Sequence, residues 1–100
     1  MRTPNHPSVD SLSLVQVLHA LSDPIRLGLV CNLASAGDQP CNALNLGVAK
    51  STASHHFRVL REAGVIRMRA EGTQFINSLR RDDLERRFPG LLDAVLRAGS

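Results

Sequence analysis

The stretch STASHHFRVLREAGVI, residues 51–66, decides how this chain folds. Its apolar side chains recur at helical spacing and would form one buried stripe: Ala53, Phe57 and Leu60. Gly64 follows this stripe, and glycine commonly ends a helix because it adopts the left-handed conformation without strain. The pattern therefore predicts a helix over Lys50–Ala63, whose start Ser51 or Thr52 would cap.

Polar and basic side chains fill the opposite face of this predicted helix: Lys50, Thr52, His55, Arg58 and Glu62. Between residues 50 and 69 the chain has five cations and one anion, a net charge of +4, whereas the whole chain carries +3. Basic charge is thus concentrated in one segment, as a surface that contacts the phosphates of DNA requires. Small hydroxyls and imidazoles in the first two turns suit base contacts, while Arg58 and Arg61 lie where the helix would meet phosphates.

The segments on either side complete a recognisable arrangement. Cys41–Leu46 is predicted to form a short helix that Gly47 ends, so a short helix and a tight turn precede the longer basic helix. Two short runs then follow, 65–70 and 74–79, separated by the turn residues 71–73. They predict a β-hairpin, which would be the wing of a winged helix-turn-helix.

Further helices are expected at both ends of the chain. From Val9 onward, apolar residues recur at intervals of three and predict a first helix: Leu12, Val15, Leu18 and Leu21. Asp23 suits an N-cap and Pro24 the first position of a second helix, over 24–34. After the hairpin, Asp82 or Asp83 would cap a last helical stretch that Pro89-Gly90 interrupts.

These elements predict a mainly α fold with a small β-hairpin, of class α+β, in the order ααααββα. A chain of 100 residues has room for one hydrophobic core, so residues 9–100 are expected to form one domain. Residues 1–8 show no apolar periodicity and would form a flexible N-terminal arm.

Composition narrows the class of function. No apolar stretch is long enough to span a bilayer, the N-terminus lacks the apolar region of a signal peptide, and the two cysteines fit a reducing compartment. We therefore expect a cytoplasmic protein without a membrane partner. The chain also lacks a glycine-rich phosphate loop and a nucleophile motif, so we expect neither an enzyme nor a cofactor.

Two motifs together resemble the ArsR/SmtB family of bacterial winged-helix repressors. The segment LSDPIRL, residues 21–27, is similar to the family pattern L-x-D-P-x-R-L at the start of the second helix. Residues 51–64 are similar to the pattern S-T-x-S-H-H-x-x-x-L-R-E-A-G of the recognition helix and its exit. The resemblance extends over nearly the whole chain, from about Leu12 to Leu96.

The resemblance implies a homodimer, built from the first and last helices, that represses transcription until an inducer releases it from double-stranded DNA. Its operator would be two-fold symmetric, with half-sites roughly 34–36 Å apart. The residues that would read the major groove are Lys50, Ser51, Thr52, Ser54, His55 and His56. Arg69, on the wing, would enter the minor groove or contact phosphate.

The chain departs from the metal-sensing members of that family. They use a Cys-x-Cys pair before the recognition helix, whereas this chain has only Cys41 there, and it has no histidine after His56 for a last-helix site. His55 and His56 point about 100° apart on a helix and would not easily bind one ion. We therefore expect no metal site of the usual kind.

What would induce release is left open by the sequence. Cys31 and Cys41 could be oxidised and act as a sensor, could be small packed hydrophobes, or could bind a soft metal, and a small molecule is a further alternative. Two other functions compete with DNA binding: a winged-helix interaction module that does not bind DNA, and a small Cys/His metal-handling protein. The basic helix favours DNA over both.

Overall fold

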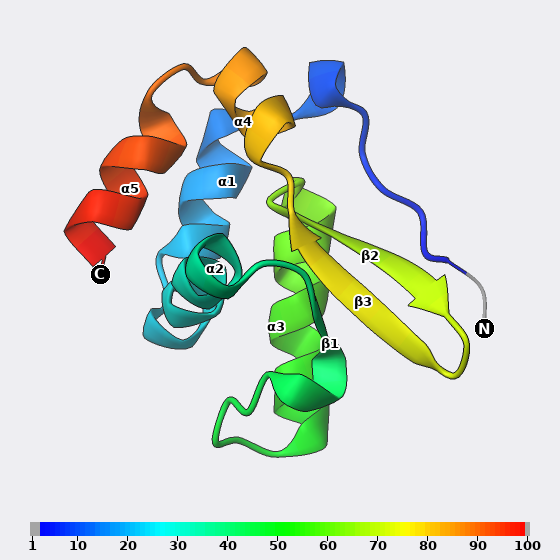
Figure 1. Ribbon diagram of the computed structural model, residues 1–100. Helices are drawn as coiled ribbons and strands as arrows, with labels where there is room; N and C mark the ends of the chain where they lie inside the picture. Colours follow the sequence, from blue (N-terminus) through cyan, green and yellow to red (C-terminus); the bar gives the residue numbers. More distant parts are fainter. Residues whose placement is uncertain (1–2, 100) are drawn as a thin grey trace.

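The computed structural model describes residues 3–99 and shows a helical domain with a small sheet packed against one side (Figure 1). The helices are α1 (Leu14–Leu21), α2 (Pro24–Ala36), α3 (Lys50–Ala63), α4 (Arg81–Arg87) and α5 (Leu91–Gly99), with 3-10 turns η1 (Val9–Ser11) and η2 (Cys41–Ala43). The strands are β1 (Gln39–Pro40), β2 (Ile66–Glu71) and β3 (Gln74–Leu79). The predicted class, mainly α with a β-hairpin, is confirmed.

The second helix begins as predicted. Asp23 is the N-cap, and its carboxylate accepts hydrogen bonds from the backbone N–H groups of Ile25 (2.9 Å) and Arg26 (3.0 Å). Pro24 occupies the first turn, where its missing N–H costs nothing. The first helix is shorter than expected, because Ser13 is the N-cap of α1 and separates it from η1.

The basic helix has the predicted bounds but a different start. Ala49 is its N-cap residue and makes no side-chain cap, so the prediction that Ser51 or Thr52 caps it is wrong. Its end is as expected: Gly64 has φ 85°, and a Cβ there would collide with the side chain of Leu12. Glycine is therefore required at this position both for its conformation and for its lack of a side chain.

The segment before the basic helix differs from its prediction. Only η2 forms there, because Pro40 is paired with Ile76 as part of β1 and Asn45 turns the chain by accepting a hydrogen bond from the Gly47 N–H. The six residues between Pro40 and Gly47 are too few for a stable α-helix once both ends are held in this way.

The hairpin is confirmed, with one strand more than predicted. β2 pairs with β3 in antiparallel register up to Glu71 opposite Gln74, so the turn consists of Gly72 (φ 63°) and Thr73. β1 pairs with the other edge of β3, and the sheet order is β1-β3-β2. The extra strand joins the end of α2 to the wing.

The C-terminal region forms two helices. Arg80 occupies the N-cap position of α4 without capping it by its side chain, so the prediction that Asp82 or Asp83 is the cap is wrong. Both aspartates lie instead in the first turn, where their charge favours the helix dipole. α5 follows the break at Pro89-Gly90 and lies beside α2.

The hydrophobic core lies where the helices meet the sheet. The apolar side chains that are completely buried in it come from α1, α2, α3, the start of the wing and α4: Val17, Val30, Leu60, Val65, Ile66 and Leu84. By contrast, α1 leaves Leu14, Val15 and Leu18 exposed by 46%, 75% and 45%. Among the described residues no single helix is long and apolar enough to cross a membrane; α1 and α2 satisfy that test only jointly, and they are bent by 98°.

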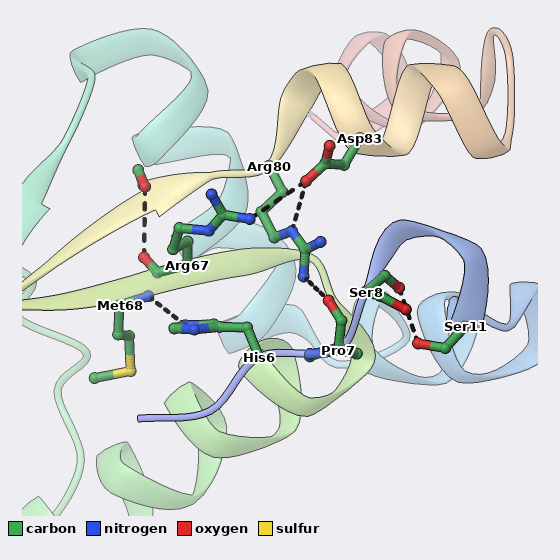
Figure 2. Close-up of polar contacts among 9 residues, drawn as sticks. His6, Pro7, Ser8, Ser11, Arg67, Met68, Arg80 and Asp83 are labelled. Carbon is green, nitrogen blue, oxygen red and sulfur yellow. Dashed lines mark hydrogen bonds and ion pairs between the residues drawn. The ribbon is translucent and has the colours of Figure 1, made fainter. Parts of the chain in front are cut away.

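The described part of the N-terminal arm lies along β2 (Figure 2). His6 Nε2 accepts a hydrogen bond from the Met68 N–H at 2.9 Å, and Thr3 Oγ1 accepts one from the Ala70 N–H at 3.2 Å. Arg80 holds the other end of the arm by donating to the Pro7 carbonyl oxygen at 2.8 Å. Residues 1 and 2 of the predicted arm lie outside the described residues.

Candidate DNA-binding site

The exposed face of α3 carries most of the predicted reading residues. Five of the six are exposed: Lys50, Ser51, Thr52, Ser54 and His55. Arg58, the predicted phosphate contact, is exposed as well. The opposite side of the helix packs on the core through Phe57 and Leu60, which are 7% and 0% exposed. Burial of this stripe fixes the rotation of α3, so the polar face is held toward solvent along its whole first half.

His56 does not share this face. It is 7% exposed, and its Nδ1 lies 3.1 Å from Arg26 Nη1. Arg26 is equally buried and also donates to the carbonyl oxygens of Ala20 (2.7 Å) and His19 (3.3 Å), at the end of α1. Arg26 and His56 therefore connect α1, α2 and α3 within the interior of the domain. The sequence had led us to expect that His56 contacts bases, and this structural role was not predicted.

The two arginines further along the predicted site, Arg61 and Arg69, both lie close to other side chains. Arg61 is half-buried, its Nη1 lies 4.0 Å from Met68 Sδ, and its buried Nε has no hydrogen-bond partner in the described part of the chain. Arg69 donates to Asp38 at 3.2 Å and to Glu71 at 3.3 Å. The hydrogen bond that Arg69 donates to Asp38 is the main reason that the pKa of Arg69 is raised above its ordinary value. Arg69 is therefore a paired cation.

A groove of about 720 Å³ separates α3 from the sheet and η2. Its floor is apolar and includes Leu44, Phe57 and Phe75. Three cations line it, and no acidic residue does: Lys50, Arg58 and Arg61. This groove and the exposed face of α3 share Lys50 and Arg58, so they are parts of one basic surface.

The cysteines are separate features. Cys31 in α2 and Cys41 in η2 are half-buried free thiols. Cys41 Sγ accepts a hydrogen bond from Asn77 Nδ2 at 3.1 Å. Within residues 3–99 no group of three or more histidine, cysteine or acidic side chains could hold a metal ion.

A model of the family described as "Bacterial regulatory protein, arsR family" matches residues 15–67, from α1 into β2. The chain belongs to the ArsR family. The match covers the elements that present the basic face of α3, so the resemblance that the two motifs carry is confirmed. This protein is a transcriptional regulator with a DNA-binding helix-turn-helix.

Similar proteins extend the match beyond those residues. The uncharacterized HTH-type transcriptional regulator YceK of Bacillus subtilis is 35% identical over 83 residues, which are 80% of this chain and 83% of that protein. The crystal structure of the transcriptional repressor BigR from Xylella fastidiosa is 30% identical, with a TM-score of 0.61 over 75% of this chain and 85% of that one. Another crystal structure, of an ArsR family transcriptional regulator, has a TM-score of 0.65 over 87% and 97% of the chains; at 21% identity it shows the fold alone.

Proposed function

We propose that this ArsR-family regulator binds a two-fold symmetric operator as a homodimer and represses transcription. The observation that carries the proposal is the exposed polar face of α3, where hydroxyls and an imidazole lie between Lys50 and Arg58. A helix of this composition can enter the major groove, with its small side chains at base edges and its cations at phosphates. The name of the similar repressor BigR supports repression as the outcome.

The apolar face of α1 supports the dimer. Leu14, Val15 and Leu18 lie on one exposed side of that helix, and a second copy could bury them. A two-fold dimer through α1 and α5 would hold the two α3 helices in the same orientation toward successive major grooves, roughly 34–36 Å apart.

An inducer completes the proposal. Thiol oxidation at Cys31 and Cys41 is one candidate: their sulfurs would form a disulfide while hydrogen peroxide takes the two electrons and two protons and becomes two waters. A Cys31→Ser, Cys41→Ser double variant should then remain on its operator in peroxide, and release equal to that of the parent protein would contradict it. The alternative inducers are a soft metal and a small molecule.

The test of DNA binding starts with selection of bound sites from random duplexes. Affinity for the selected site should fall steeply with salt, because phosphate contacts release counterions. Lys50→Ala and Arg58→Ala should each lower the slope of log K against log salt by about 1, whereas Thr52→Ala should mainly relax base preference.

Arg86→Ala is the matched control, because Arg86 is an exposed arginine of α4, at the far end of the molecule from the start of α3 (Figure 1). It removes the same charge and should leave the slope unchanged. If no sequence is preferred over bulk DNA at moderate salt, the repressor proposal fails and a winged-helix interaction module becomes the better account.

A further inference from the structure

We propose that the groove between α3 and the wing binds a small organic carboxylate with an apolar body, and that this ligand competes with DNA. The binding step stands on the groove alone. The competition rests on the proposed function, because it requires that Lys50 and Arg58 contact the operator.

The shape and lining of the groove argue for a small molecule. Its volume of about 720 Å³ lies within the range of ligand sites, roughly 300–1,000 Å³. The apolar floor comes from three parts of the fold: Leu44 after η2, Phe57 in α3, and Phe75 in β3. Since these segments are far apart in sequence, the groove is a feature of the tertiary structure and is open to solvent in the described conformation.

The charge of the groove selects an anion. Lys50, Arg58 and Arg61 line it without any acidic neighbour in the lining. Arg61 is half-buried, and its Nε has no acceptor within the described residues. A buried donor of this kind gains from an acceptor, and a carboxylate matches the planar fork of a guanidinium.

DNA alone does not account for both properties. A phosphate backbone would satisfy the cations at the rim, but it has no apolar part to cover the floor, where Phe75 is only partly buried. A carboxylate with an alkyl or aromatic body would satisfy both, with its head at Arg61 and its body on the floor. Bound there, it would neutralise charge that the operator needs, so the two ligands would exclude one another.

Calorimetric titration of the full chain with decanoate tests the binding step, with decanol and acetate as matched probes that lack the charge or the apolar body. We expect one saturable site for decanoate and at least about tenfold weaker binding of both other probes. Amide resonances of the residues that line the groove should shift, and those of α1 and α5 should not. Absence of saturable decanoate binding, or shifts confined to α1 and α5, would overturn the proposal.

Two variants test the parts of the site separately. Phe75→Ser removes apolar floor and should weaken decanoate binding at least about tenfold. Arg61→Met keeps the stem but removes the charge, and should abolish the preference for decanoate over decanol; Arg86→Met on α4 is its control. If Phe75→Ser fails to fold, Arg61→Met still tests the charged part of the site. The proposal is overturned if Arg61→Met prefers decanoate over decanol as strongly as Arg86→Met does.

Competition is measured on the selected operator. At ten times its own Kd, a competing decanoate should raise the apparent operator Kd about elevenfold for each groove that must be empty, which is about 120-fold for a dimer whose two α3 helices both contact the operator. If decanoate binds the groove but no operator can be selected, the proposed function is wrong, and the groove remains a carboxylate-binding site. If the operator binds and decanoate does not, only this inference fails.

Discussion

Arg26 Nη1 lies 3.1 Å from His56 Nδ1, and this buried contact joins the start of α2 to the middle of α3. A guanidinium can only donate, so His56 Nδ1 must accept and the ring carries its proton on Nε2. The neighbouring His55 is exposed on the polar face of the same helix. The histidine pair is thus divided between the interior and the exposed polar face of α3.

The two histidines should therefore respond differently to replacement by alanine. His56→Ala leaves the buried Arg26 guanidinium without one acceptor, which should cost about 1–3 kcal/mol. For a domain of this size that lowers Tm by roughly 4–8 °C per kcal/mol. His55→Ala should change stability by less than about 0.5 kcal/mol and mainly relax base preference. Calorimetric melting and operator selection measure the two effects, and equal Tm losses would contradict the division.

Arg26 should tolerate neither loss nor exchange for lysine. Its side chain donates to the Ala20 carbonyl oxygen at 2.7 Å and to the His19 carbonyl oxygen at 3.3 Å, both at the end of α1, where few backbone donors are available. The His19 carbonyl also accepts from the N–H and the hydroxyl of Ser22, so the contact to Ala20 matters more. Arg26→Met should destabilise the fold by about 3 kcal/mol, seen as a lower urea midpoint at unchanged m. Arg26→Lys should recover only part of this, because one ammonium cannot reproduce the fork. Full recovery by lysine would show that charge alone matters.

Attachment of the N-terminal arm should depend on pH through His6. Burial, and then the charges of Arg67, Arg80 and Arg61, lower the pKa of His6 below its ordinary value of 6.5. The folded state therefore favours the neutral ring, whose Nε2 accepts from the Met68 N–H (Figure 2). This contribution is fully present above pH 6.5 and is lost as pH falls through the lowered pKa of the folded state.

The Met68 amide resonance reports this titration directly. Its shift should move with pH below 6.5 in the parent protein and stay constant in His6→Ala, while His6→Gln should retain an acceptor at all pH values. A Met68 resonance that titrates equally in His6→Ala would show that another group is responsible.

Local chemistry explains what could be predicted from the sequence. The N-cap at Asp23, the end of α3 at Gly64 and the hairpin turn at Gly72 each depend on a few adjacent residues, and all three are found as expected. Strand β1 could not be predicted, because it exists only through its pairing with β3.

The candidate site, like the fold, could be predicted from the sequence only where local pattern determines it. The outward residues of α3 follow from helical phase. His56 lies three residues after Ala53 and four before Leu60, so helical phase favours the buried side, whereas the family resemblance had put it among the residues that read the groove. The ion pair of Arg69 with Asp38 had no such signal, since the two residues are 31 positions apart and meet only through tertiary structure.

That ion pair leads to a last prediction, on the wing. Asp38 holds Arg69 at 3.2 Å and adds a negative charge close to a side chain that we expect near the DNA backbone. Asp38→Asn should leave Glu71 as the remaining acidic partner of Arg69 and make Arg69 more available to phosphate. We expect operator affinity to rise several-fold at low salt and the slope of log K against log salt to steepen by up to about 1. Asp82→Asn is the control, because it makes the same charge change at an exposed position of α4, outside the proposed DNA and dimer surfaces. Equal gains from both variants would mean that net charge, and not the release of Arg69, sets the affinity.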